Sequence, residues 1–149
     1  MTAKEKALQL LEKRDYSRAE LIKKLIEKGF DGTEAAEAVD SLVSLGFVDD
    51  ARYAPIVVRH YSQKGYGMGR IKSELTRRGV PKELWEDALA ELSDSGDTLD
   101  AVIARKLGGR VPDRKELKRL TDMLLRRGFS WSEIKTALGR YDENLEETD

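Results

Sequence analysis

Hydrophobic residues recur at intervals of three and four positions along nearly the whole chain of 149 residues. This spacing places apolar side chains on one face of an α-helix, whereas a half-buried strand alternates with a period of two. No stretch of strand length alternates in that way, and only three prolines interrupt the pattern. The sequence therefore predicts an all-α protein built from short helices.

A longer pattern repeats within these helices. An apolar residue, a leucine and a glycine follow one another at intervals of four, and the pattern ends at Gly29, Gly79 and Gly128, which are spaced by about 50 residues. Glycine adopts the left-handed conformation at a helix C-terminus without a steric penalty. Each of the three glycines is therefore expected to end a helix and to have a structural role.

The residues after each glycine suit the start of a new helix. Asp31 with Glu34 and Ser130 with Glu133 form capping-box patterns, and Pro81 suits a first helical position. Within these helices one equivalent apolar position holds Ala35, Trp85 and Ile134. Trp85 is therefore interpreted as a structural residue.

Another apolar helix precedes each pattern, so one unit contains three helices. We predict three tandem three-helix repeats, residues 1–48, 49–96 and 97–141, followed by an acidic tail, residues 142–149, that is expected to be disordered. A repeat of this size buries little surface by itself, so neighbouring repeats should share apolar contacts. An elongated, curved array is therefore favoured over a single globule.

Composition excludes several classes of protein. The chain contains no cysteine, which excludes disulfides, thiol catalysis and cysteine-ligated metal, and its one histidine, His60, cannot build a multi-histidine site. No apolar run is long enough for a membrane span, and the N-terminal residues lack the pattern of a signal peptide. We expect a cytoplasmic protein without a cofactor.

The second repeat contains a long motif with fixed spacing. It reads Gly46-Phe47-Val48-Asp49-Asp50-Ala51-Arg52-Tyr53-Ala54, then Arg59, then Lys64-Gly65-Tyr66-Gly67, Arg70-Ile71 and Glu74-Leu75. This motif resembles the signature of the RecX family, which comprises bacterial regulators of the recombinase RecA. The threefold pattern extends the resemblance over nearly the whole chain.

The resemblance implies a monomeric, elongated, all-helical regulator without enzymatic activity. Members of the family lodge in the groove of the RecA–DNA filament, which contains single-stranded DNA, and inhibit RecA ATPase, strand exchange and coprotease activities. The resemblance therefore connects the chain with homologous recombination, DNA repair and the SOS response.

Candidate filament contacts are polar side chains of the second repeat. They are Arg52, Arg59, Lys64, Tyr66, Arg70, Lys72, Arg77 and Arg78. Two structural alternatives stay open. Glu74 lies four residues from both Arg70 and Arg78, which suits salt bridges within one helix. Tyr66 matches Tyr16 of the first repeat, which favours packing.

Three features of the second repeat suggest chemistry but have simpler explanations. Asp49 and Asp50 suit helix capping better than magnesium binding, because no further ligands accompany them. If Asp50 is the N-cap, Pro55 lies inside the helix that follows and removes one backbone hydrogen bond. The glycine-rich segment 65–69 lacks the strand and the lysine of a nucleotide loop, so it is predicted to be a turn.

The third repeat has a larger net positive charge than either of the other two repeats, although the formal net charge of the whole chain is only −1. The basic-surface candidates are Lys115, Lys118, Arg119, Arg126 and Arg127. Such residues suit contacts with phosphates or with an acidic protein surface, but a stripe of this kind is also common on the solvated face of ordinary helices. A standalone helical DNA-binding protein is therefore the alternative function. We further hypothesise that the acidic tail screens this surface.

Overall fold

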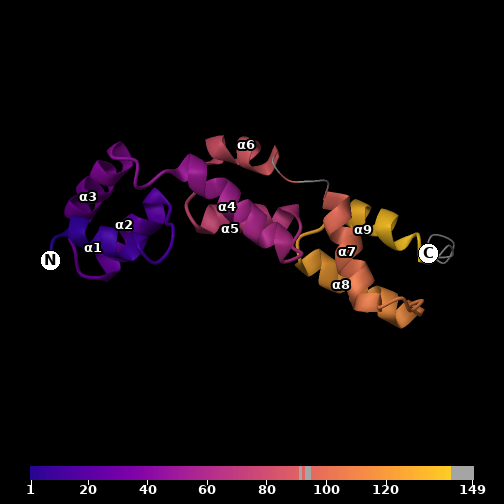
Figure 1. The fold of residues 1–149 in the computed structure, drawn as a ribbon. Coiled ribbons are helices and arrows are strands. Elements are labelled where there is room, and N and C mark those ends of the chain that lie inside the picture. The colour runs from indigo at the N-terminus through magenta and orange to yellow at the C-terminus, as the bar shows by residue number, and fades with distance from the viewer. Residues whose placement is uncertain (91, 93–94, 142–149) are drawn as a thin grey trace. The chain divides into compact units, whose positions relative to one another are not determined.

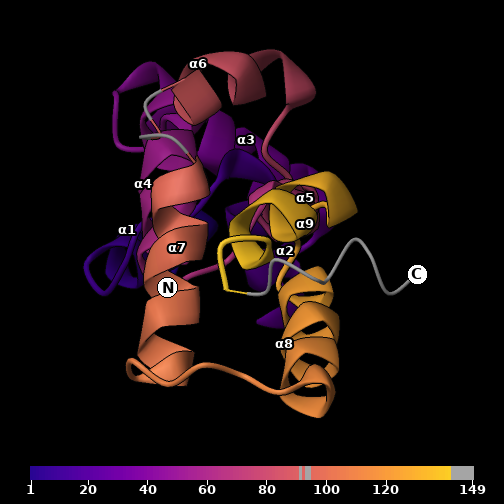
Figure 2. The same ribbon diagram turned by 90° about the vertical axis from the view of Figure 1, so that its right-hand side faces the viewer.

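The predicted all-α architecture is confirmed by a computed structural model, which describes residues 1–90, 92 and 95–141. The predicted disorder of the acidic tail falls outside the described residues, as does part of the link between the second and third repeats. Within the described residues every regular element is helical (Figures 1 and 2). The elements are α1 (Ala3–Leu11), α2 (Arg18–Glu27), α3 (Gly32–Ser44), α4 (Asp50–Gln63), α5 (Met68–Arg77), the 3-10 helix η1 (Lys82–Leu84), α6 (Trp85–Ala90), α7 (Ser95–Leu107), α8 (Arg114–Arg126) and α9 (Trp131–Leu138).

Short polar side chains begin most of these helices. Thr2, Ser17 and Ser130 form reciprocal capping boxes at the starts of α1, α2 and α9. Asp31 caps α3 through its side chain, which accepts a hydrogen bond from Glu34 N (3.4 Å). The capping-box pattern at Ser130 is thus confirmed with both of its hydrogen bonds. At Asp31 the observed bond is the one that the backbone of Glu34 donates to the Asp31 side chain.

The prediction that Pro81 occupies the first position of an α-helix is wrong. Pro81 precedes the 3-10 helix η1, and the α-helix starts only at Trp85. The Trp85 indole N–H donates to Val80 O (2.9 Å), so the bulky ring turns back towards the preceding turn. This bond explains the half-buried state of Trp85, whose equivalents Ala35 and Ile134 are fully buried.

Gly29, Gly79 and Gly128 all have positive φ angles, at 100°, 72° and 96°. The predicted left-handed helix ends are therefore confirmed in all three repeats. After each glycine an apolar residue bonds back to the helix, as when Phe129 N donates to Leu124 O (3.2 Å). The three almost equally spaced glycines thus end equivalent helices, one in each repeat.

The chain forms two compact units, and the division between them runs through the second repeat. One unit contains Met1–Val57 and Glu74–Leu89, and the other contains Val58–Ser73 with the described residues that follow Leu89. Helices α4 and α5 each contribute residues to both units, because apolar side chains are buried along their full lengths. The second repeat is therefore shared between the units, which the sequence periodicity does not predict.

Each unit has its own apolar core. In the first unit Leu21, Leu25, Val39 and Leu42 are completely buried, and α3 packs against both α1 and α2. In the second unit Ile103, Leu124, Ile134 and Leu138 are completely buried where α9 packs on α7 and α8. No helix among the described residues is long and apolar enough to cross a membrane.

Candidate partner-binding surfaces

The two signature aspartates bind the N-termini of two different helices. Asp49 Oδ1 accepts from the backbone N–H groups of Ala51 (3.0 Å) and Arg52 (3.3 Å), so Asp49 caps α4. Asp50, considered above as the N-cap of α4, is instead the first residue of that helix. Its Oδ1 accepts from Arg18 N (2.8 Å) at the start of α2. Both carboxylates therefore neutralise helix N-termini.

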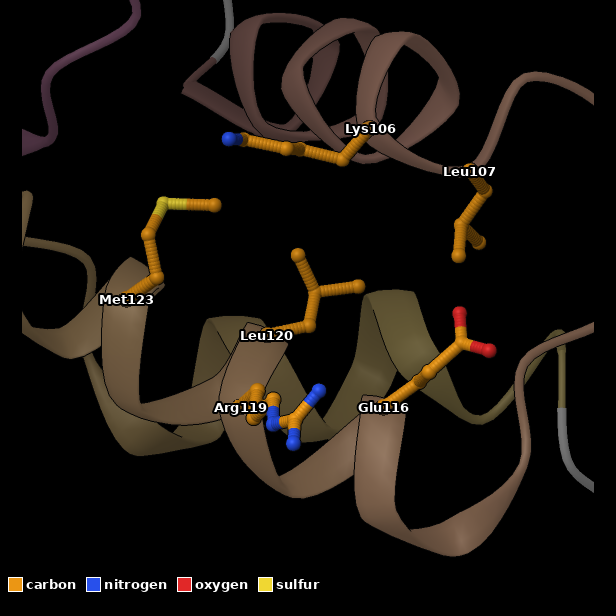
Figure 3. Close-up of a pocket in the computed structure, with 6 residues that line it drawn as sticks. All are labelled: Lys106, Leu107, Glu116, Arg119, Leu120 and Met123. Atoms are coloured by element: carbon orange, nitrogen blue, oxygen red, sulfur yellow. The ribbon is translucent and has the colours of Figure 1, made fainter.

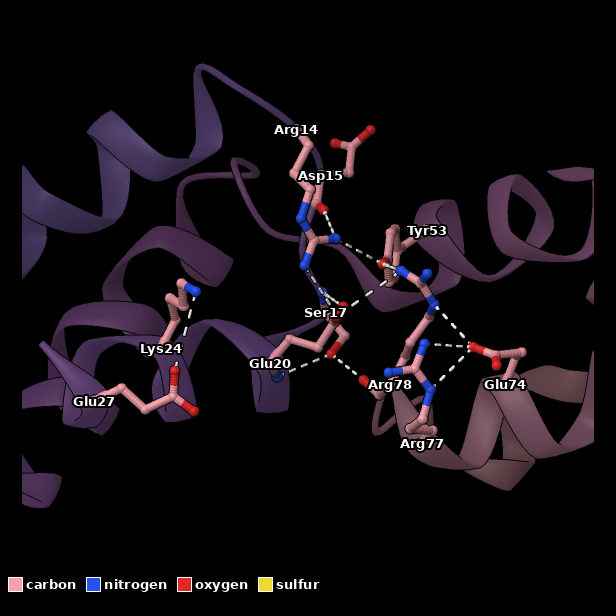
Figure 4. Close-up of polar contacts among 10 residues, drawn as sticks. All are labelled: Arg14, Asp15, Ser17, Glu20, Lys24, Glu27, Tyr53, Glu74, Arg77 and Arg78. Atoms are coloured by element: carbon pink, nitrogen blue, oxygen red, sulfur yellow. Dashed lines mark hydrogen bonds and ion pairs between the residues drawn. The ribbon is translucent and has the colours of Figure 1, made fainter.

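A mostly buried polar network surrounds Tyr53 in the first unit (Figure 4). The Tyr53 hydroxyl accepts from Arg78 Nη1 (2.8 Å) and Arg14 Nη1 (3.3 Å). The same Arg78 guanidinium lies 3.6 Å from Glu74 Oε2 and 3.9 Å from Glu20 Oε2. Burial, followed by the adjacent Glu20 carboxylate, raises the pKa of the Tyr53 phenol. The network connects α2, α4 and α5 within one unit.

This network explains two of the eight candidate filament contacts as structural residues. The Arg78 side chain is only 21% exposed and its guanidinium binds groups of the protein itself. The Arg77 side chain is 66% exposed, but its guanidinium binds the buried carboxylate of Glu74 (2.7 Å). The predicted salt bridge between Glu74 and Arg78 is therefore present, and Arg77 takes part in it as well.

Five other candidates of the second repeat are exposed. They are Arg52, Arg59, Lys64, Arg70 and Lys72. Arg52 lies in the first unit, and the other four lie in the second. Their cationic groups are therefore accessible to a partner, as the sequence interpretation requires.

The glycine-rich segment brings two stretches of backbone into contact within the second unit. Gly67 N donates to Arg127 O (2.7 Å) and Gly69 N donates to Gly128 O (3.0 Å). A Cβ atom on Gly67 would lie 2.6 Å from the carbonyl carbon of Gly128, and one on Gly128 would collide with the backbone of Arg70. These glycines therefore serve close packing of backbone rather than binding of a nucleotide.

The same contact recurs in the first unit, and we call it the glycine joint. In each case the glycine that ends the second helix of one repeat packs against the start of the second helix of the preceding repeat. A Cβ on Gly79 would lie 2.5 Å from Ala19 Cβ, and the Ser17 hydroxyl donates to Arg78 O. Gly29 lies in the first of the three repeats, and a Cβ there would meet no atom within 4 Å. Small residues at equivalent positions, Ser17 and Gly67, are the sequence signal for this joint.

Arg127 and Tyr66 belong to the glycine joint of the second unit. Arg127 Nη1 donates to the carbonyls of Lys64 (3.1 Å) and Gly65 (3.4 Å). Its guanidinium carbon lies 5.5 Å from the centre of the half-buried Tyr66 ring, and that of Arg70 lies 5.0 Å from the same ring. The packing interpretation of Tyr66 is therefore favoured, and Arg127 is separated in role from the other basic residues of its helix.

The remaining four basic-surface candidates are exposed on α8, and we call them the α8 stripe. They are Lys115, Lys118, Arg119 and Arg126. Leu117, Leu120 and Leu124 of the same helix are buried in the core of the second unit. The α8 stripe is therefore a cationic surface suited to phosphates or to a carboxylate-rich protein surface. The described residues contain no cluster of three or more metal-ligating side chains.

Comparison with known proteins agrees with this arrangement of repeats. Models of the first, second and third three-helix domains of RecX match residues 3–42, 49–89 and 94–138. The chain belongs to the RecX family. Since the three domains follow one another along the chain, the RecX match confirms the three-repeat fold as well as the family.

Individual RecX proteins are similar over most of their length. The regulatory protein RecX of Vibrio parahaemolyticus is 34% identical over 146 residues, which cover 97% of this chain and 94% of that protein. RecX of Trichlorobacter lovleyi is 40% identical over 130 residues, 83% of this chain and 84% of that protein. The crystal structure of RecX from Lactobacillus salivarius matches with a TM-score of 0.78 and 26% identity over 95% of both chains. The chain is thus a RecX-family regulatory protein.

Proposed function

We propose that this chain binds the RecA–DNA filament and lowers its ATPase, strand-exchange and coprotease activities. The observation that carries the proposal is the match of all three RecX domains in order along the chain. Exposed cations in both units supply surfaces for such a partner. The site is proposed to lie in the filament groove, where carboxylates of RecA and phosphates of single-stranded DNA are both accessible to basic side chains.

In the proposed mechanism the protein inhibits RecA by occupying the filament groove. A protein that contacts neighbouring RecA subunits at once resists their rearrangement, and ATP turnover and strand exchange require that rearrangement. The two glycine joints, each inside one compact unit, hold their helices in close contact and so present side chains without a large ordering cost. The protein itself is proposed to act in the cytoplasm as a monomer and to catalyse no reaction.

A standalone DNA-binding function is the second candidate, and the α8 stripe favours it. Four exposed cations on one helix suit a run of phosphates without any need for RecA. Binding of this kind depends steeply on salt, because each phosphate contact releases counterions. The two candidates therefore differ in whether the filament or the nucleic acid is the preferred partner.

The proposal is tested by the DNA-dependent ATPase rate of RecA with increasing amounts of this protein. We expect inhibition that saturates. Changing Lys115, Lys118 and Arg126 to glutamate should raise the concentration for half-inhibition by about tenfold or more at low salt, because three contacts change from attraction to repulsion. Arg119 is left unchanged because it also lines a groove described below.

A matched control makes the same change of net charge in the first repeat. Lys4, Lys13 and Lys23 are exposed, so their replacement by glutamate should change half-inhibition much less. Equal effects of the two triple variants would assign the change to overall charge rather than to the α8 stripe. An unchanged ATPase rate with saturating wild-type protein at low salt would contradict the proposed function itself.

A further inference from the structure

A small apolar groove lies between α7 and α8 in the second unit (Figure 3). Its volume is about 200 Å³, and its lining residues are Lys106, Leu107, Glu116, Arg119, Leu120 and Met123. The side chains of Leu120 and Met123 point from α8 towards α7, and Leu107 points from α7 towards α8 (Figure 3). A cavity of about 150 Å³ lined by apolar groups is large enough for benzene, so this groove accommodates one branched aliphatic side chain.

The rim of the groove is positively charged. Lys106 and Arg119 are exposed, and among the described residues neither forms an ion pair. The Glu116 carboxylate on the same rim is bound by Arg110 Nη1 (3.2 Å), which offsets its charge. An occupant with carboxylates on both sides of an apolar residue therefore matches the groove in shape and in charge.

The acidic tail has that composition. Residues 142–149 contain five carboxylates and one aliphatic residue, Leu145, which has acidic residues both before and after it. Sulfur-containing and branched aliphatic side chains such as those of Met123 and Leu120 pack readily around an inserted leucine. No described segment of the chain occupies the groove.

Tyr141, which directly precedes the tail, lies in the second unit, which also contains the groove. Arg140 Nη1 binds Asp100 Oδ2 on α7 (2.9 Å), and Tyr141 packs against the core of the second unit. Leu145 follows Tyr141 by four residues, which span up to about 14 Å when extended. Lys106 follows Asp100 along the same helix by six residues, a rise of about 9 Å. Four extended residues are therefore longer than the axial rise from Asp100 to Lys106 along α7.

We propose that the acidic tail, residues 142–149, docks in the α7–α8 groove, with Leu145 inserted between Leu107, Leu120 and Met123 and its carboxylates against Lys106 and Arg119. Docking places five negative charges beside the α8 stripe and lowers its attraction for acidic partners. The inference goes beyond the proposed function, and its structural test contains neither RecA nor DNA, so the two can fail independently.

The test uses the three methionines of the chain as probes. Labelling their methyl carbons gives three NMR signals, from Met1, Met68 and Met123, and only Met123 lines the groove. Ending the chain after Tyr141 should shift the Met123 signal and leave the other two in place. Leu145→Ala, which keeps every carboxylate, should move the Met123 signal in the same direction, whereas Asn144→Ala should not.

Charge reversal provides a second, independent arm. In an Arg119→Glu background the tail should no longer dock, so removing it should leave the Met123 signal unmoved. In the matched Arg114→Glu background, where the changed residue is exposed on the same helix but outside the groove, removing the tail should still shift it. A shift that fades on dilution would assign the groove to the tail of a second molecule and overturn docking within one chain.

An unshifted Met123 signal after removal of the tail overturns the proposal. So does a shift that Leu145→Ala fails to reproduce, because the anchor is then not leucine.

For binding, the tail is tethered at an effective concentration in the millimolar range, comparable with the dissociation constant expected of so short a segment. Leu145→Ala should therefore tighten binding of a carboxylate-rich partner or of DNA by roughly two- to tenfold at low salt.

Discussion

Replacing Gly128 by alanine should destabilise the protein by about 3 kcal/mol, the largest single-residue effect that we expect from the backbone. Gly128 has a φ angle of 96°, which disfavours alanine by about 1–2 kcal/mol. Its new Cβ would also collide with the backbone of Arg70. Relief of that collision separates the hydrogen bonds from Gly67 and Gly69, each worth about 1 kcal/mol. Urea denaturation followed by circular dichroism measures the loss.

Gly29→Ala is the matched control for this prediction. Gly29 occupies the equivalent position of the first repeat with a φ angle of 100°, but a Cβ there meets no atom within 4 Å. We expect it to cost only about 1 kcal/mol, from the backbone conformation alone. Equal losses in the two variants would show that the glycine joint contributes nothing beyond the left-handed turn.

Replacing Glu74 by alanine should cost about 2–3 kcal/mol, because it leaves part of a buried ion network without its carboxylate. The Glu74 side chain is only 7% exposed and lies 2.7 Å from Arg77 Nη2 and 3.6 Å from Arg78 Nε. Arg78 keeps its bond to Tyr53 and its proximity to Glu20, which limits the loss. The free energy of unfolding in urea is again the measurement.

The control for the Glu74 prediction is an exposed ion pair on α2. The Glu27 carboxylate lies 4.0 Å from Lys24 Nζ with both side chains about half exposed, so Glu27→Ala should change the free energy of unfolding by less than about 0.5 kcal/mol. Glu74→Gln keeps the side-chain size and should fall between the two. A loss at Glu74 no larger than at Glu27 would contradict the structural role given to the network, and Arg77 and Arg78 would again be candidates for partner contact.

The sequence predicts the elements well because the signals that define them are local. Helix ends at Gly29, Gly79 and Gly128 follow from the conformational freedom of glycine, and the cap at Ser130 follows from its spacing to Glu133. These signals lie within a few residues of the feature that they predict. The elongated and curved form of the array is not a local property, and it stays a prediction.

The roles of the polar side chains are less predictable because their partners are distant in the sequence. Asp50 accepts a hydrogen bond from the first residue of a helix that begins 32 positions earlier, and Arg127 binds the carbonyl of Lys64, which is 63 positions away. A helical wheel predicts which face a side chain occupies but not which group it meets. Arginines that hold the fold and arginines that are accessible to a partner therefore have the same appearance in the sequence.

The central claim is that the RecA–DNA filament is the partner of this protein, and equilibrium affinity tests it most directly. Binding of the labelled chain is measured to RecA filaments on single-stranded DNA and to the same DNA without RecA, over a range of salt concentrations. We predict binding to the filament that is tighter by about tenfold or more at physiological salt and loses less affinity as salt rises. Equal affinity for the two, with a steep loss as salt rises, would contradict the claim and favour a standalone DNA-binding protein.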